Sequence, residues 1–142
     1  MNTFRVSRTV EFGDTDMAGI VHFANFFRFM EAAEHAYLRA CGLSVYGTWQ
    51  GQAIAFPRVS ASCDYVKSAR FEDELTIEVR VERIGRTSIR FGFAVLRAEE
   101  ELARGQITAV LCRVRDDHTL EAMAFPDDLR ERIMAGPVGD VR

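Results

Sequence analysis

Asp14 and Asp16 are the residues of this chain best suited to chemistry, because two carboxylates stand two positions apart in the segment EFGDTDMAGIVHFANFF, residues 11–27. Acidic pairs usually belong to solvated loops, whereas Ile20 and Phe23 favour burial. Charged residues and core-forming residues therefore share one short segment. A carboxylate beside a carbonyl carbon can act as a nucleophile or as a general base that activates water. This segment is therefore the first candidate for an active site.

The chain just after the acidic pair predicts a second group for such a site. Gly19 permits a sharp backbone turn, and the residues up to Phe23 lead into a helix. The first N–H groups of a helix have no partner within it, and near Phe23 they can stabilise a developing oxyanion. Asp16 and the Phe23 amide would then face one carbonyl, which suits attack on a thioester. Asp14 and Asp16 also fit a plain turn or a helix N-cap, so their spacing alone leaves the function open.

The spacing of apolar residues predicts one strand, one long helix and then a series of strands. Alternation predicts a strand from Phe4 to Phe12, and helical spacing predicts a helix from Ala24 to Cys41, closed by Gly42. Further strands are expected within residues 55–66, 74–84, 88–97 and 107–115, joined by a Gly-rich connection at 46–52, a tight turn at 85–87 and a returning segment at 99–106. A short terminal helix is expected within residues 126–136, capped near Asp127 and stopped by Gly136.

This order of elements predicts an α+β fold with one antiparallel sheet of about five strands and the helix against a single face. The helix contains more phenylalanine than a surface helix needs, so the sheet is expected to curl around it, as in the hotdog fold. The whole chain, residues 1–142, is expected to form one such domain. Because the edge strands would stay exposed, we also expect a homo-oligomer, either a dimer or a tetramer.

Composition and charge argue against several classes of function. The 142 residues carry 21 acidic and 18 basic side chains, a net charge of −3, which gives no reason to expect nucleic acid or an anionic membrane as a partner. Cys41, Cys63 and Cys112 stand far apart without a CxxC spacing, so neither disulfides nor a metal site is expected, and a reducing, cytoplasmic location fits best. No segment has the apolar length of a signal peptide or a membrane span.

The segment GDTDMAGIVHFANFFRFME resembles the signature of hotdog-fold acyl-CoA thioesterases of the 4-hydroxybenzoyl-CoA thioesterase family. The match falls on Asp14, Asp16, Gly19, Ile20, Val21, Asn25 and Phe26, and the resemblance continues through CGL, PRVSASCDYVKSARFEDELTIE and the final AFP. The resemblance implies that Asp16 is the catalytic carboxylate and that the Phe23 amide binds the thioester carbonyl. It implies no separate cofactor, because coenzyme A is part of the substrate.

The resemblance also implies a set of substrate-binding residues: Gly19, Val21, His22, Asn25, Phe26, Glu31 and Arg86. Glu31 stands where the family keeps an acid that can reach the acyl group, although a structural salt bridge explains it equally well. Arg86 aligns with a basic turn that can bind the phosphates of coenzyme A, and a solvated strand face is its plainer interpretation. Phe56 replaces a hydroxyl residue before Pro57, which favours an apolar acyl or aryl group over hydroxybenzoyl.

These observations predict a cytoplasmic acyl-CoA thioesterase that releases a short-chain, medium-chain or aromatic acid from coenzyme A. One alternative is a hotdog hydratase or dehydratase, which would need a differently placed His with an acid on the helix. The other alternative is a non-catalytic acyl-binding or scaffold protein, in which Asp16 persists only as a turn former. The intact Asp16 speaks against this last interpretation.

Overall fold

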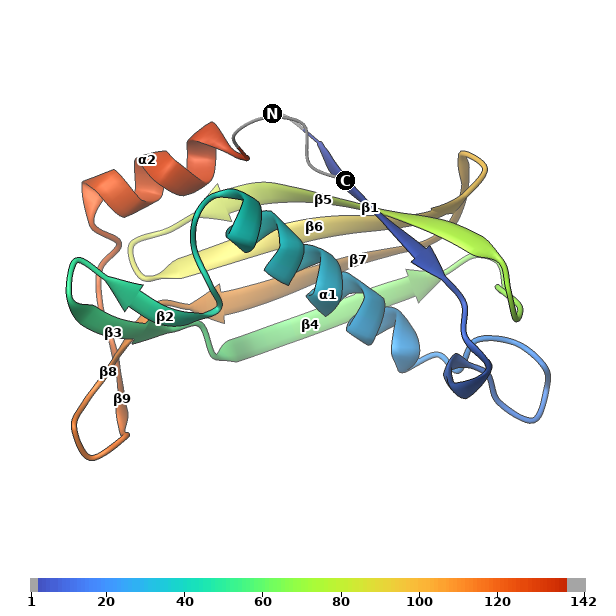
Figure 1. Cartoon of the computed structure of the whole chain (residues 1–142), viewed down its shortest axis with the longest axis horizontal. Helices are drawn as coiled ribbons and strands as arrows, with labels where there is room; N and C mark the ends of the chain where they lie inside the picture. The colour runs from blue at the N-terminus through green and yellow to red at the C-terminus, as the bar shows by residue number, and fades with distance from the viewer. Residues whose placement is uncertain (1–2, 138–142) are drawn as a thin grey trace.

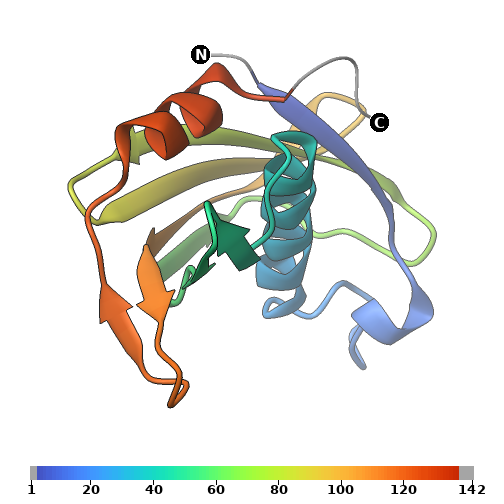
Figure 2. The same cartoon turned by 60° about the vertical axis from the view of Figure 1, so that its left-hand side comes forward.

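The computed structural model describes residues 3–137 and shows a long helix held in the curve of an antiparallel sheet (Figure 1). The helix is α1 (Asn25–Ala40). The main sheet has the strand order β1-β5-β6-β7-β4, with bounds β1 Phe4–Thr9, β5 Glu74–Ile84, β6 Ser88–Arg97, β7 Glu100–Val110 and β4 Arg58–Tyr65. Figure 2 shows this sheet arching over α1, so the predicted α+β arrangement of the hotdog fold is confirmed.

A second, smaller sheet and a short helix gather at the left-hand end of the main sheet in Figure 1. The small sheet has the order β2-β3-β8-β9, with bounds β2 Tyr46–Trp49, β3 Gln52–Ala55, β8 Cys112–Val114 and β9 Leu120–Ala122. The short helix is α2 (Asp127–Ala135). Strands this short carry too few alternating residues to be recognised as a separate sheet from the sequence.

Both helices end at the glycine residues that the sequence predicts as their C-terminal stops. Gly42 follows α1 with a φ of 81°, and the Leu43 amide beyond it donates to the Leu38 carbonyl at 2.8 Å. Gly136 ends α2 with the same left-handed φ of 81°. Glycine adopts this conformation without strain, which is why it ends helices so often.

Residues 99–106 were expected to return the chain between strands, and this expectation was wrong. Only Ala98 and Glu99 form the turn, with φ values of 48° and 68°, and β7 begins at Glu100. Within β7, Leu102 and Gly105 are buried, whereas Arg104 is exposed. The charged residues of this segment therefore mark the solvent face of a strand rather than a loop.

The expected connection at 46–52 is also a strand pair. β2 and β3 form a hairpin in which Gln50 and Gly51 make the turn, with φ values of 50° and 81°. Two successive left-handed residues are typical of the tight turns whose twist suits a hairpin.

Three expected strands end early or are divided. β1 ends at Thr9 rather than Phe12, because the chain turns there into the short 3-10 helix η1 (Phe12–Asp14). The strand expected within 55–66 is divided at Pro57, which has no N–H to donate to a ladder. The strand expected within 107–115 is divided at Leu111, whose amide donates to Thr87 and whose carbonyl accepts from Met123.

The core lies between α1 and the concave face of the main sheet. The helix contributes Phe26, Phe29, Met30, Ala33, Tyr37 and Leu38, all buried. The helix and the sheet approach so closely that a Cβ atom added at Gly105 would lie 2.5 Å from the Met30 methyl carbon. Burial of each large apolar side chain contributes about 1.5–3 kcal/mol, so this packing fixes the axis of α1 against the sheet.

One charged residue, Glu34, is buried within this core. Its carboxylate accepts a hydrogen bond from the Arg58 guanidinium at 2.6 Å, and Arg58 also donates to the Phe56 carbonyl at 2.9 Å. The second carboxylate oxygen, Oε1, has no hydrogen-bond partner among residues 3–137. Burial raises the pKa of Glu34 from 4.5 to about 7, although Arg58 favours the charged form.

We predict that the free energy of unfolding falls as the pH rises from 4.5 to about 7. In this range the folded protein keeps a proton on Glu34 that the unfolded chain has already released. One such group gives a slope of at most about 1.4 kcal/mol per pH unit. Urea unfolding of wild type and Glu34→Gln at several pH values checks this, because the amide does not titrate and neighbours such as His35 are common to both proteins. Parallel stability curves across this window would contradict the prediction.

Candidate active site

Asp16 lies at the base of a tight loop that follows η1. Thr15 and Val21 form an isolated antiparallel bridge, and the Asp16 amide donates to the Ile20 carbonyl at 2.9 Å. Gly19 closes the loop with a φ of 80°, and its amide donates to the Asp16 carbonyl at 3.0 Å. The bridge and the loop bonds hold the backbone of Asp16 in one place.

The Asp16 side chain is half-buried and only partly bonded. Its Oδ1 atom accepts a hydrogen bond from the Ala18 amide at 2.9 Å. The other oxygen, Oδ2, has no hydrogen-bond partner in the described range 3–137. The carboxylate is thus oriented through one oxygen while the other stays available for reaction.

The backbone amides at the start of α1 have acceptors with one exception. Those of His22, Ala24, Asn25, Phe26 and Phe27 all donate to atoms of residues 14–24. The Phe23 amide finds no acceptor in the part of the chain that the structure describes. Ala24 is the N-cap of α1, so Phe23 stands one position before the N-cap, at the positive end of the helix. A free donor at this position can stabilise negative charge on a carbonyl oxygen.

Asp14 connects this helix start to strand β1. Its carboxylate is buried, and both of its oxygens lie 3.0 Å from Nη2 of Arg8. One of them also accepts from the Glu11 amide at 2.8 Å. The Asp14 carbonyl accepts from the His22 amide at 2.9 Å and from the Asn25 side chain at 2.8 Å.

Arg8 also contacts helix α1. Its guanidinium carbon lies 4.9 Å from the centre of the Phe29 ring, on the buried face of α1. Arg8 and Asp14 therefore join β1, η1 and α1, and they act as a structural pair, whereas Asp16 is the carboxylate with a free oxygen.

The other residues assigned to substrate binding occupy different surroundings. Val21 and Phe26 are buried in the core, and Asn25 uses its side-chain amide on the Asp14 carbonyl. His22 is exposed, and its Nδ1 accepts from the Ala24 amide at 3.2 Å, so its Nε2 atom faces outward. Their contact with substrate stays a prediction.

Glu31 and Arg86 are both exposed. Glu31 lies in the second turn of α1, and Arg86 lies in the turn between β5 and β6. That turn is at the opposite end of the sheet from the start of α1 (Figure 1), so one chain does not bring Arg86 to Asp16. Their roles likewise stay predictions.

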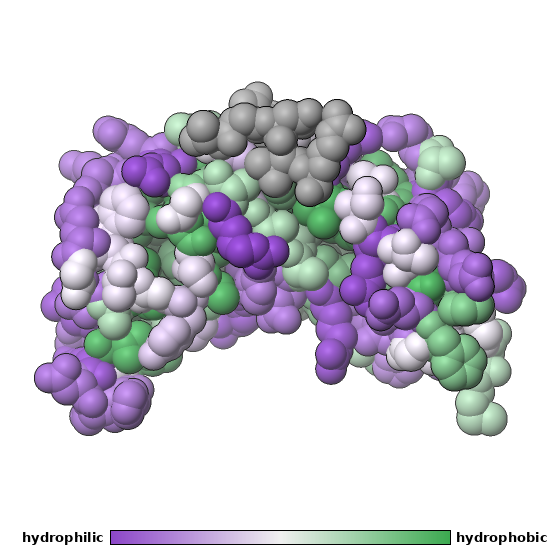
Figure 3. Space-filling view, in the orientation of Figure 1, coloured by the Kyte–Doolittle hydropathy of each residue, from purple (hydrophilic) through white to green (hydrophobic). Residues whose placement is uncertain are grey.

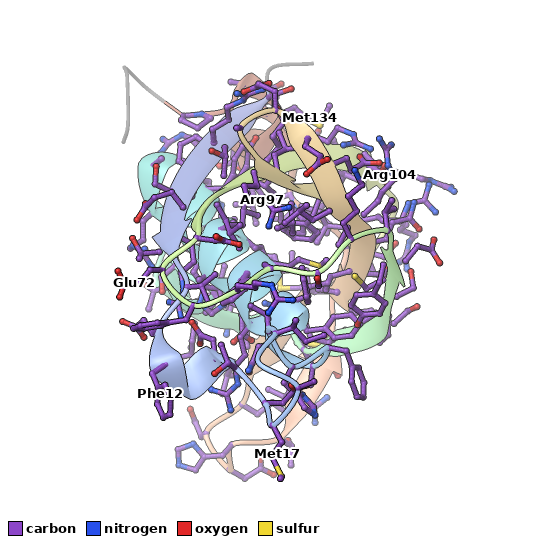
Figure 4. The ribbon with its side chains drawn as sticks, turned by 90° about the vertical axis from the view of Figure 1, so that its right-hand side faces the viewer. Phe12, Met17, Glu72, Arg97, Arg104 and Met134 are labelled. Carbon is purple, nitrogen blue, oxygen red and sulfur yellow. The ribbon has the colours of Figure 1, made fainter. Side chains whose placement is uncertain are left out.

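The end of the molecule that carries the Asp16 loop presents apolar side chains to solvent. Figure 4 looks onto this end, where Phe12 and Met17 project outward and are 79% and 107% exposed. Figure 3 shows apolar residues toward the middle of the face that carries α1, with hydrophilic residues around its margin. The loop that carries Asp16 is therefore flanked by exposed apolar side chains.

Two residues that contact the site were not predicted from the sequence. Arg8 lies on the same face of β1 as Phe4 and Val6, so the alternation directs its side chain inward, but its pairing with Asp14 was not predicted. Tyr65 ends β4, and its hydroxyl donates to the Phe23 carbonyl at 3.0 Å. A charged residue on the inward face of β1 was a signal that the sequence offered for Arg8, whereas no pattern connects Tyr65 with the acidic pair.

The described part of the chain contains no group of three or more His, Cys, Asp or Glu side chains placed to hold a metal ion. None of the helices among residues 3–137 has the length and apolar character needed to cross a membrane.

Residues 18–104 match the Thioesterase superfamily. A 1,4-dihydroxy-2-naphthoyl-CoA hydrolase from Nostoc punctiforme is 31% identical over 127 residues, which cover 89% of this chain and 84% of that protein. A solved complex of 4-hydroxybenzoyl-CoA with a 4-hydroxybenzoyl-CoA thioesterase variant, in which an aspartate is replaced by asparagine, superposes with a TM-score of 0.81 at 28% identity, covering 92% of this chain and 98% of that chain. A 1,4-dihydroxy-2-naphthoyl-CoA thioesterase from Synechocystis gives 0.78 at 26% identity, with coverage of 93% and 96%.

The match to the superfamily spans more than half of the residues, and the similar solved structures share nearly the whole fold. The thioesterase family expected from the sequence is therefore confirmed, and the chain belongs to the Thioesterase superfamily.

Proposed function

We propose that this protein hydrolyses an acyl-CoA thioester to the free acid and coenzyme A, with Asp16 and the Phe23 amide as its catalytic groups. The observation that carries the proposal is the pairing of a carboxylate that has one free oxygen with an unpaired amide at the positive end of a 16-residue helix. A thioester carbonyl placed between them would have its carbon near the carboxylate and its oxygen near the amide.

In the nucleophilic route, Asp16 attacks the carbonyl carbon and the Phe23 amide stabilises the resulting oxyanion. Collapse of this intermediate expels coenzyme A as a thiolate and leaves a mixed anhydride on Asp16, which water then hydrolyses. In the general-base route, Asp16 takes a proton from water as the water attacks the same carbon. Single-turnover hydrolysis in ¹⁸O-water separates the two routes. Incorporation of ¹⁸O into the Asp16 carboxylate would indicate the nucleophilic route, because only the anhydride can place the label there.

We propose an aromatic acyl group as the preferred substrate, with short-chain and medium-chain acyl groups as the alternative. The similar proteins named above act on bicyclic or monocyclic aromatic thioesters of coenzyme A. In this chain Phe56 is buried, and its ring lies 6.4 Å from that of Phe125. A phenyl ring at this position supports a pocket that favours apolar rings over hydroxylated ones. Because one chain does not bring Arg86 to Asp16, Arg86 of a second copy would bind the phosphates of coenzyme A.

We further propose that the enzyme works as a homo-oligomer in the cytoplasm. β4 is an edge strand of the main sheet, and most of its residues are exposed, including Val59 at 61%. An exposed edge with apolar side chains favours pairing with a second copy. The cysteines Cys41, Cys63 and Cys112 are unpaired, which suits a reducing compartment.

Light scattering is predicted to give a mass of at least twice the 16.1 kDa of one chain, because the β4 edge would otherwise remain unpaired in water. The measurement should be made at micromolar protein, with size-exclusion chromatography to separate species. A mass of one chain, in protein that hydrolyses substrate, would exclude an obligate oligomer.

Asp16→Asn is predicted to lower the rate of thiol release by on the order of 10² or more, because the amide can act neither as nucleophile nor as base. Its stability should stay within about 0.5 kcal/mol of wild type, since the asparagine oxygen can still accept from the Ala18 amide. Thiol release is measured with a panel of aromatic and aliphatic acyl-CoAs, and stability by urea unfolding.

Asp14→Asn is the matched control, because it makes the same change two residues away. It should cost about 1–3 kcal/mol of stability by removing the buried charge that holds Arg8. Equal activity of wild type and Asp16→Asn would remove Asp16 from the mechanism. Wild type that is inert across the whole panel would overturn the proposed function.

A further inference from the structure

We propose that Tyr65 is a positioning residue for the oxyanion donor, because its hydroxyl fixes the turn that presents the Phe23 amide. The inference rests on the proposed function, since it concerns the same amide. It adds a residue from β4, on the far edge of the main sheet, to a site otherwise built from the segment between β1 and α1.

The contact joins the end of β4 to the start of α1. Tyr65 is the last residue of β4 and pairs with Ala103 of β7, so the main sheet anchors its backbone. The Tyr65 hydroxyl donates to the Phe23 carbonyl at 3.0 Å. Its ring meets the Phe23 ring edge to face at a centroid distance of 6.3 Å, and the Phe26 ring at 5.4 Å. These ring contacts place the hydroxyl over the turn.

The Phe23 carbonyl has weak support from its own segment. The Phe26 amide donates to it at 3.3 Å, which is long for an N–H donor. The Phe23 side chain is 62% exposed, so burial in the core does not hold the residue either. Within the described residues, Tyr65 supplies the contact to this carbonyl from outside the segment 14–27. The hydroxyl thus adds a restraint to a residue whose own segment holds its carbonyl through one long hydrogen bond.

The Phe23 N–H and the Phe23 carbonyl belong to the two peptide groups that flank its Cα atom, so both groups must be held for the residue to keep one orientation. The peptide group before Phe23 is held because the His22 carbonyl accepts from the Asn25 amide at 2.9 Å. The peptide group after Phe23 is held by Tyr65 through the carbonyl and by the His22 ring, which accepts from the Ala24 amide. With both flanking peptide groups fixed, the Phe23 N–H has one direction before substrate binds. A donor oriented in advance stabilises an oxyanion more effectively than one that must reorient.

Tyr65→Phe tests the inference, because it removes the hydroxyl and keeps the ring contacts. We expect kcat to fall by about tenfold, the effect of losing one hydrogen bond, with KM within about twofold of wild type. The thermal midpoint should not change. Tyr46→Phe is the matched control, since Tyr46 is also exposed and its hydroxyl makes no hydrogen bond within residues 3–137. This control should leave both constants unchanged.

A second measurement does not depend on activity. Backbone ¹⁵N relaxation should give rigid order parameters at Phe23 and Ala24 in wild type, near 0.85, and lower values in Tyr65→Phe. Unchanged kcat in an active enzyme, a change confined to KM, or equal order parameters in the two proteins would each overturn the positioning role. Lower order parameters in a protein that is inert toward every acyl-CoA would support the role of Tyr65 in the turn and count against the proposed function alone.

Discussion

The buried carboxylate of Asp14 is the constraint on which the rest of the site depends. It is held by Arg8 and by a backbone amide, while the carbonyl of the same residue accepts from two donors at the start of α1. A buried charge is tolerated only where its partners are in place, so this arrangement has few alternatives. One residue therefore joins β1 to α1, and Asp16, two positions further along, takes its location from that junction.

Asp14 and Asp16 carry the same functional group, and their surroundings give them opposite roles. Asp14 is buried with every contact directed into the fold, so its carboxylate cannot reach a ligand. Asp16 stands beyond the bridge between Thr15 and Val21, where the chain leaves the core and one carboxylate oxygen is free. The two acids therefore differ in their surroundings, because Asp14 ends η1 against β1, whereas Asp16 begins the loop that Gly19 closes.

The features predicted from the sequence are those set by long periodic patterns. Helix α1 and strands β5 and β6 followed directly from the spacing of apolar residues. Asp16 and Phe23 were chosen from residue type and from the chemistry of a helix start, and their catalytic roles stay predictions. The short strands of the second sheet were not predicted, because three or four residues are too few to show a period. Arg8 and Tyr65 were missed because no local pattern pairs Arg8 with Asp14 or Tyr65 with Phe23, although Arg8 shares the inward face of β1 with Phe4 and Val6.

The helix combines two requirements that could have conflicted. Its apolar face must pack tightly against the sheet, as Met30 does over Gly105, and this packing fixes its axis. The proposed mechanism also requires an unpaired amide just before its N-cap, at Phe23, which would destabilise the fold if that amide were buried. Because Phe23 lies at the rim and is 62% exposed, water can satisfy the amide until a substrate arrives. The rigid core thus orients the donor, and exposure at the rim keeps it free.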